Sequence, residues 1–265
     1  MPGKRFRVLM LGDIVGQPGY RAVLTSVAKL VKQYSADFIT INAENAADGF
    51  GVTEEIASEL FASGFHVLTT GNHVWQRKEA YSYLDSEERI LRPANYPGGN
   101  PGHGSCVVQA KGVRVGVINL QGRVRMPTTD CPFRKGKEVI RKLKDGTDLL
   151  LVEFHAEAPH EKEALAWHID GQVAAVVCTH THVQTADERV LPKGTAYISD
   201  LGACAPRDSV IGFDPGISVE RMKTQLPLRN SPADTPGVIH GVFIEVDLDT
   251  GHALSIERVR EESLV

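Results

Sequence analysis

The chain has 265 residues, of which 42% are hydrophobic, enough for a substantial buried core. It carries 29 lysines and arginines against 33 acidic residues, a formal net charge of −4. No basic run could follow a nucleic-acid backbone, so stable nucleic-acid binding is not expected. An anionic ligand would have to be attracted by local charges, and bound divalent ions would supply them.

The cysteines show no CxxC spacing, which excludes zinc-ribbon and redox motifs, and a chain of this size needs no disulfide framework. The four cysteines are Cys106, Cys131, Cys178 and Cys204. An apolar run at residues 8–11 follows basic side chains, but Asp13 interrupts it too early for a signal peptide. No apolar stretch is long enough to span a membrane. We therefore expect a soluble, cytoplasmic protein with no membrane association.

Through the first two thirds of the chain, apolar runs of strand length alternate with segments of helical period. This pattern is typical of an α/β fold with a mostly buried sheet. The strands expected first are residues 6–11, 37–41 and 65–70. Apolar residues from Val23 to Tyr34 recur on one face of a helix. Thr53 is the expected N-cap of a second helix.

Beyond Trp75 we expect a short helix that leads to Arg89-Ile90-Leu91, followed by a long surface loop rich in proline and glycine at 93–102. Residues 105–120 read as a hairpin that turns at Ala110-Lys111-Gly112. The remaining expected elements are strands 149–154 and 173–178, a helix at 161–169, and a hairpin of 241–248 with 254–259.

The segment from Ala203 to Gly237 has many proline, glycine and charged residues and little periodicity. Such segments are usually functional loops or lids, and a lid and a subunit contact both remain open here. A homo-oligomer is compatible with either. No position looks like a domain boundary, because candidate site residues come from both halves of the chain. We expect one domain covering residues 1–265.

Acidic, amide and imidazole side chains gather just after successive apolar strands, the end of a sheet at which α/β proteins bind ligands. The segments are Leu11-Gly12-Asp13, Ala43-Glu44-Asn45, Gly71-Asn72-His73, Phe154-His155 and Cys178-Thr179-His180-Thr181-His182. No single cluster is specific, since a lone Asp after a strand is often a turn former. Their joint occurrence predicts one shared site.

His180 and His182 are two positions apart, and in an extended segment such residues point to the same side. With His155 they would form a nitrogen-rich half of a site. The oxygen-rich half would come from Asp13, Glu44 and Asn72. Mixed imidazole and carboxylate ligands suit manganese, iron or zinc rather than calcium. The absence of cysteine from these segments argues against a structural zinc site.

The order of these motifs resembles the calcineurin-like metallophosphoesterases, and most closely their YmdB-like branch. The motifs that carry the resemblance are Gly12-Asp13-Ile14-Val15-Gly16, Asn42-Ala43-Glu44-Asn45-Ala46-Ala47, Thr70-Gly71-Asn72-His73, Asp130-Cys131-Pro132-Phe133, His155-Ala156-Glu157 and Thr179-His180-Thr181-His182. The resemblance covers most of the chain. It implies a sandwich of central β-sheets flanked by helices, with a metal site at the strand C-terminal ends.

Two positions depart from the general superfamily pattern. Where many members have Asp-x-His, this chain has Asp13-Ile14-Val15, so the first histidine ligand is missing. Glu44 stands where a bridging aspartate is more common. We infer that Asn45 fills the vacant ligand position, as in the YmdB-like branch. This oxygen-rich environment favours iron or manganese, with zinc as an alternative.

The resemblance implies two divalent or trivalent metal ions per chain. It assigns Asp13, Asn45 and His182 to one ion, Asn72, His155 and His180 to the other, and Glu44 to a bridge between them. Such a pair clamps a phosphate and lowers the pKa of a bound water, so the implied reaction is attack of a metal-bound hydroxide on phosphorus. No GxSxG nucleophile motif is present.

By the same resemblance, His73 faces the substrate and protonates the leaving oxygen, although a histidine that caps the following helix is the alternative. Arg123 and Arg125 could each contact a phosphate oxygen through the guanidinium fork, or be solvated loop charges. Of the remaining histidines, His103 is the one most expected to approach a substrate.

The expected activity is hydrolysis of phosphodiesters, with cyclic nucleotides such as 2′,3′-cyclic AMP or RNA-related diesters as substrates. A phosphomonoesterase or nucleotidase would use the same pair of ions. The alternative from a different class is a regulatory scaffold whose metal site holds the fold together and which signals through partners.

Overall fold

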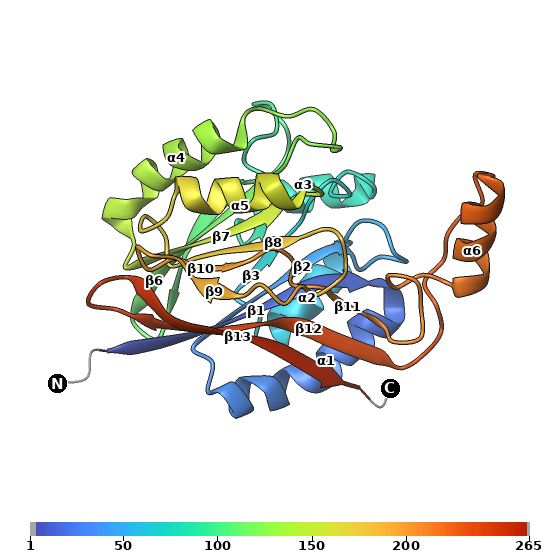
Figure 1. Cartoon of the computed structure of the whole chain (residues 1–265), viewed down its shortest axis with the longest axis horizontal. Coiled ribbons are helices and arrows are strands. Elements are labelled where there is room, and N and C mark those ends of the chain that lie inside the picture. Colours follow the sequence, from blue (N-terminus) through green and yellow to red (C-terminus); the bar gives the residue numbers. More distant parts are fainter. Residues whose placement is uncertain (1–3, 264–265) are drawn as a thin grey trace.

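The computed structural model describes residues 4–263, and its centre consists of two β-sheets with helices on the outside of each (Figure 1). The seven-stranded sheet has the spatial order β13 (His252–Glu262), β12 (Gly237–Asp247), β11 (Ala203–Pro206), β1 (Arg5–Val15), β2 (Phe38–Asn45), β3 (Val67–Thr69) and β4 (Ile90–Leu91). The six-stranded sheet has the order β5 (Ser105–Ala110), β6 (Val113–Gln121), β7 (Leu149–His155), β8 (Ala175–Thr179), β10 (Ala196–Ile198) and β9 (Arg189–Val190).

The helices cover the outer faces of this pair of sheets. They are α1 (Gly16–Tyr34), α2 (Glu54–Ala62), α3 (Tyr81–Ser86), α4 (Pro132–Leu143), α5 (Pro159–His168) and α6 (Pro215–Thr224), with short 3₁₀ turns η1 (Lys78–Ala80) and η2 (Lys144–Gly146). One apolar cluster joins α1 and α2 to the seven-stranded sheet, and another joins α4 and α5 to the six-stranded sheet. Among the described residues, no helix has the length and apolar character needed to cross a membrane.

The strand β1 shows how the sequence builds these layers. Successive side chains of a strand point to opposite faces, and here both faces are buried, so the strand reads as a continuous apolar run. Val8 and Met10 pack into the cluster between the two sheets, whereas Leu9 and Leu11 pack toward the helices. The α/β fold predicted from the alternating pattern is thereby confirmed, and so is the sandwich of sheets that the family resemblance implied.

Most predicted elements are present at slightly different boundaries. Thr53 caps α2 by accepting a hydrogen bond from the Ile56 amide at 3.3 Å. The hairpin turns at Lys111-Gly112, as expected. The pattern did not predict α4, although Pro132 occupies its first turn and its apolar residues line one face. The short strands β9 and β10 also went unpredicted.

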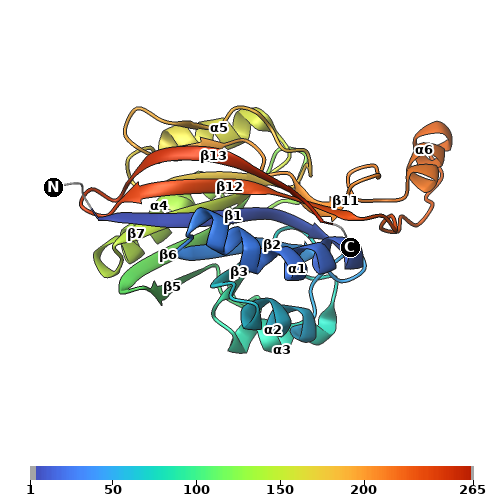
Figure 2. The same ribbon diagram turned by 90° about the horizontal axis from the view of Figure 1, so that it is seen from below.

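The segment that lacked periodicity contains β11 and α6 rather than irregular chain alone. Figures 1 and 2 both show α6 standing apart from the two sheets. Its exposed side chains include Met222, which is 79% exposed, and Val219. Ser218 is the only buried residue of this helix among those described.

Phe38 provides a test of the packing between the sheets. Its side chain is fully buried and stacks on His66 with ring centroids 4.7 Å apart. We expect Phe38→Ala to lower the free energy of unfolding by about 3–5 kcal/mol, because it leaves a cavity in the shared core. Denaturant unfolding measures this. Val107→Ala, at a 44% exposed position of β5, serves as the control and should change stability by less than about 0.5 kcal/mol. Similar values for both variants would contradict the described packing.

Candidate metal centre

The polar residues predicted to follow the strands lie close together. They meet at the edge where the carboxyl ends of the strands of one sheet face those of the other. Asp13 lies within β1, opposite Ala203 of β11, at a register irregularity rather than beyond the strand. Asn45 is the last residue of β2 and His155 the last of β7. The site is therefore shared between the two sheets.

Four ligand-type atoms converge in the deeper half of the site. The Nε2 atom of His155 lies 3.0 Å from Nδ1 of His180, 3.0 Å from Oδ1 of Asn72 and 3.1 Å from Oε1 of Glu44. Glu44, His155 and His180 form a group able to hold a metal ion. His155 and Glu44 are almost completely buried.

The neighbours on the outer side of the His155 and His180 rings determine which ring nitrogen faces the site. Nδ1 of His155 lies 2.9 Å from the Thr179 hydroxyl, which itself donates to Oε1 of Glu153 at 2.8 Å. The hydroxyl therefore accepts a hydrogen bond from Nδ1–H of His155, and Nε2 of the same ring points into the site, where it offers a lone pair once it is deprotonated. His180 has its Nε2 atom 3.3 Å from Glu157, so its Nδ1 lone pair also points inward.

The pKa values of these groups show that the cluster demands a positive charge. Burial alone lowers the pKa of His155, but the carboxylates of Glu44 and Asp13 raise it to about 9. The pKa of His180 is lowered to about 3, by burial and by the charge of His155. One cation is thus strongly favoured among these atoms. A divalent ion satisfies the same demand, so the donor set fits a metal.

The second half of the site is formed by Asp13, Asn45 and His182. Oδ1 of Asp13 is buried and has no hydrogen-bond partner among the described residues. Burial raises the pKa of Asp13 to about 6. His182 donates from Nδ1 to the Ile211 carbonyl at 2.9 Å, so its Nε2 lone pair faces inward, 3.2 Å from Nδ2 of Asn45. An orphaned carboxylate oxygen beside an imidazole lone pair also fits a metal ion.

Glu44 lies between the two halves. Oε1 faces His155, and Oε2 accepts the backbone N–H of His73 at 2.9 Å. Although burial opposes it, the charge of His155 and its hydrogen bond lower the pKa of Glu44 to about 2. The carboxylate is therefore ionised, as a group that bridges two ions must be.

His180 and His182 reach different halves of the site. The expectation that both side chains point to the same side of an extended segment was therefore wrong. Their φ angles are 104° and 64°, in the left-handed region that side chains rarely adopt. The backbone therefore turns sharply between them. His180 faces His155, whereas His182 faces Asn45 and Asp13.

Asp200 holds this turn, and nothing in the sequence pattern indicated its role. Its buried Oδ2 atom accepts from the backbone N–H and the hydroxyl of Thr181, and from Nζ of Lys162 at 2.8 Å. Oδ1 accepts from the Gly202 amide at 2.9 Å. Lys162 and Asp200 are both almost completely buried. The charged acceptor between the two histidines compensates for the strained backbone.

A second supporting network lies beneath the ligands and also escaped prediction. Glu153 accepts from the side chains of Thr179 and Asn42, and pairs with the Thr69 hydroxyl. Asn42 in turn accepts the backbone N–H of Glu44 at 3.0 Å. Burial raises the pKa of Glu153 to about 8. These polar residues occur inside apolar strands, and only their meeting across the two sheets distinguishes them from isolated core residues.

Gly71 is required where the two sheets approach. A Cβ atom at this position would lie 2.2 Å from the His155 ring. The glycine that precedes Asn72 therefore allows the imidazole to pass over the backbone, which is a reason for the Gly-Asn-His motif that the sequence alone did not give.

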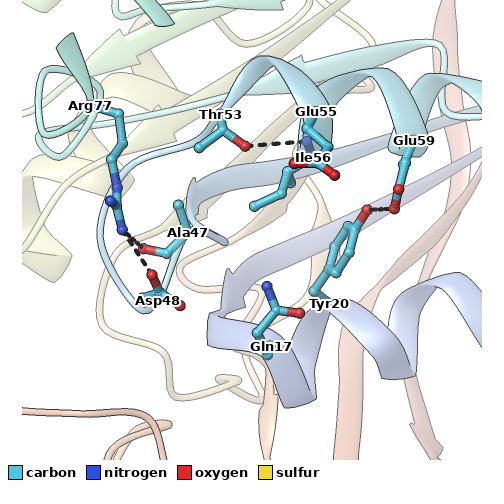
Figure 3. Close-up of a pocket in the computed structure, with 9 residues that line it drawn as sticks. All are labelled: Gln17, Tyr20, Ala47, Asp48, Thr53, Glu55, Ile56, Glu59 and Arg77. Atoms are coloured by element: carbon cyan, nitrogen blue, oxygen red, sulfur yellow. Dashed lines mark hydrogen bonds and ion pairs between the residues drawn. The ribbon is translucent and has the colours of Figure 1, made fainter. Parts of the chain in front are cut away.

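His73 borders the site and is partly accessible, with 26% of its side chain exposed. Its Nδ1 atom lies 2.6 Å from Oδ1 of Asn45, and its ring meets the edge of Phe50 at 5.2 Å between centroids. Arg77 secures the loop that carries Phe50, since it donates to the carbonyls of Phe50 and Ala47. Figure 3 shows Arg77 turned toward Ala47 across a separate polar pocket.

The three predicted substrate-contact residues are placed differently. The amide of Arg123 donates to Glu161 at 3.0 Å, in a loop that starts where Gly122 donates to the His155 carbonyl. Arg125 belongs to the same loop, at a φ of 60°. His103 instead contacts the backbone of Asp85 at the end of α3, not the converging ligands. The loop that carries Arg123 and Arg125 therefore begins beside the converging ligands. His103 contacts α3 and not these ligands.

Comparison with known proteins places this arrangement in a family. A family model described as YmdB-like protein matches residues 9–259. The chain belongs to the YmdB-like family. It is 47% identical to the 2′,3′-cyclic-nucleotide 2′-phosphodiesterase of Bacillus subtilis over 253 residues, which cover 96% of each chain.

Solved structures agree with membership of the YmdB-like family. The crystal structure of a phosphatase from Mycoplasma pneumoniae has a TM-score of 0.92 at 34% identity, and the match covers 98% of this chain and 95% of that chain. The NAD nucleotidase of Haemophilus influenzae shares the fold, with a TM-score of 0.63 at 14% identity over 98% of this chain and 56% of that chain.

These findings confirm the YmdB-like resemblance, the fold class and the expected class of enzyme, a phosphoesterase. The fold implies divalent metal ions, and the group of Glu44, His155 and His180 could hold one. The assignment of individual residues to ions, and of His73 to catalysis, stays a prediction.

Asp200 allows a test of how the histidine turn is held. We expect Asp200→Ala to weaken Mn²⁺ binding by about 10- to 100-fold, the usual effect of removing a partner that orients ligands. Equilibrium dialysis measures the affinity, and thermal unfolding monitors the fold. Asp148→Ala, which removes the exposed partner of Arg114, is the matched control. Native Mn²⁺ affinity in a folded Asp200→Ala protein would exclude this positioning role.

Proposed function

We propose that this chain is a metal-dependent phosphodiesterase that hydrolyses 2′,3′-cyclic nucleotides or related RNA-derived diesters. The observation that carries the proposal is the convergence of lone pairs from His155, His180, Asn72 and Glu44 on one buried point. The substrate class is supported by the name of the Bacillus subtilis relative and by the extent of that similarity.

We assign two ions to the site. Asn72, His155 and His180 would hold one, Asp13, Asn45 and His182 the other, and Glu44 would bridge them. Iron or manganese suits this mixture of oxygen and nitrogen donors, with zinc as the alternative. When bound, such ions neutralise phosphate charge and make a coordinated water acidic.

The amide of Asn45 connects the ligand set to His73. In the arrangement described, Asn45 presents Nδ2 to His182 and Oδ1 to Nδ1 of His73. A half-turn of the amide exchanges its oxygen and nitrogen and brings Oδ1 toward His182, as a ligand requires. Nδ2 then donates to Nδ1 of His73, and the imidazole proton must sit on Nε2. His73 is thereby prepared to donate that proton to a leaving oxygen.

The shared core supports one further expectation, a single domain over the described residues 4–263. The cluster between the sheets draws on β1 and β2 as well as on β6, β7 and β12. The ligand set likewise combines residues from both sheets, so neither sheet would form the site alone.

A phosphomonoesterase is the second candidate function, favoured by the Mycoplasma pneumoniae phosphatase whose structure resembles this chain. A panel of 2′,3′-cyclic, 3′,5′-cyclic and monoester nucleotides separates the two candidates in the Mn²⁺- or Fe²⁺-loaded protein. We expect the 2′,3′-cyclic substrates to be hydrolysed fastest. Preference for monoesters would favour the phosphatase, and no turnover of any member would favour a non-catalytic scaffold.

His73→Ala tests the catalytic assignment. We expect kcat for a 2′,3′-cyclic nucleotide to fall by about 10²–10⁴-fold, the usual contribution of a general acid, while both metal ions are retained. Steady-state kinetics and elemental analysis of the same preparation give the two quantities. His66→Ala changes a histidine that lies between strands away from the ligands and is the control. Full activity in His73→Ala would remove this residue from the mechanism.

A further inference from the structure

A second concave surface lies beside the metal centre, and the family comparisons assign nothing to it. We call it the arginine pocket, and the residues that define it here are His182, Arg207, Ile211, His240, Arg258 and Arg260. Its volume is about 630 Å³, within the range of small-molecule sites. It is built from β11, β12, β13 and the loops that follow β8 and β11.

The arginine pocket opens at the same end of the molecule as the ligands. Ala203, which lines the pocket, pairs in register with Asp13. Ile211 also lines the pocket, and its carbonyl accepts the hydrogen bond that orients His182. A ligand in the pocket would therefore be separated from the metal centre only by the turn that carries His182.

The lining of this pocket is positively charged although the whole chain is acidic. It includes three arginines and two histidines, and no carboxylate among the described residues. Each of the three arginines is paired with a carboxylate that lies outside the pocket: Arg258 with Glu188, Arg207 with Asp208 and Glu262, and Arg260 with Glu262. These pairs leave other N–H groups of each guanidinium unused. Arg258, for example, uses its Nε–H toward Glu188, and a guanidinium offers five N–H groups. The remaining donors can bind an anion.

The rest of the pocket suits a nucleoside. Val183, Ala205, Pro206 and Val238 provide apolar surface within it. His240 and Ser209 also line it and add polar groups. Apolar walls with a few polar groups and a cationic rim match the chemistry of a nucleotide, in which a flat base adjoins a phosphate.

We propose that the arginine pocket binds a phosphate-bearing nucleotide residue next to the reacting phosphodiester. The inference rests on the proposed function. A short oligonucleotide that ends in a 2′,3′-cyclic phosphate is then a better substrate than the cyclic mononucleotide, because only the oligonucleotide reaches the arginine pocket. The internal phosphate of the oligonucleotide pairs with Arg258 and Arg260, while the terminal phosphate lies at the metal centre.

The test compares two substrates in Mn²⁺-loaded protein: adenosine 2′,3′-cyclic phosphate, and the diadenosine dinucleotide that ends in the same cyclic phosphate. Arg258→Gln and Arg260→Gln remove charge from the pocket. Arg114→Gln removes a comparable arginine, paired with Asp148 at the start of β6, and is the matched control. Thermal unfolding shows whether each variant is folded; Arg260, with 61% of its side chain exposed, is the safer substitution.

The expected result is a loss of about tenfold in kcat/KM for the dinucleotide in each pocket variant, the loss typical of a charge-assisted hydrogen bond. The value for the mononucleotide should stay within about twofold, and higher salt should reduce the native preference for the dinucleotide. Equal losses on both substrates would overturn the proposal, as would native-like kinetics in both pocket variants.

Adenosine 5′-monophosphate is the probe that distinguishes two occupants of the arginine pocket, a nucleotide residue of the substrate and a free nucleotide. Isothermal titration of this probe should show binding to native protein that Arg260→Gln weakens and Arg114→Gln does not. If the probe alters mononucleotide hydrolysis in native protein but not in Arg260→Gln, and the dinucleotide has no advantage, the pocket serves a free nucleotide. If no cyclic nucleotide is hydrolysed, the proposed function fails, yet the titration still decides whether the pocket binds a nucleotide phosphate.

Discussion

The structure depends on one electrostatic constraint, the concentration of lone pairs and carboxylates between two apolar sheets. Asp13 and Glu44 come from one sheet and His155 from the other, and all three are buried. Charged groups in such a place are costly unless a counter-charge is present. A positive charge therefore favours the packing of the two sheets at this end. A protonated His155 supplies one, and a metal ion held by Glu44, His155 and His180 would supply another.

The surroundings of the ligands are arranged to keep those lone pairs pointing inward. His155 donates its outward N–H to Thr179 and His182 donates its own to Ile211, while the outward Nε2 atom of His180 lies 3.3 Å from Glu157. The backbone strain between His180 and His182 is held by Asp200. This division of labour explains why so many polar residues are buried in strands that otherwise read as apolar.

Membership of the YmdB-like family and the position of the arginine pocket connect the fold to substrate choice. A metal centre of the proposed kind would by itself serve monoesters and diesters equally, because a clamp of ions acts on any phosphate. Selectivity must come from groups that contact the rest of the substrate. The cationic lining next to His182 and the loop of Arg123 and Arg125 are the surfaces in reach of that role.

The sequence by itself determined the alternation of strands and helices, because burial on both faces makes a central strand apolar throughout, and a helix repeats its apolar residues every three or four positions. It also determined the ligand candidates, since polar residues directly after apolar strands stand out locally. It did not reveal the strands β9 and β10, which have only two and three residues. It also did not predict α4, although Pro132 and the apolar face of this helix were local signals that could have indicated it.

Only the tertiary structure decided the partnerships. Lys162 pairs with Asp200, and Glu153 pairs with Asn42, although these residues lie far apart in the chain. The arginines of β13 and His182 likewise come together only as the lining of one pocket. A local pattern carries no information about which distant residue completes a pair. The tertiary structure also placed His180 and His182 in different halves of the site. An extended segment would point both side chains to the same side, but the backbone at these two residues is left-handed. Local periodicity predicts an element, whereas the packing of one sheet against the other creates the site.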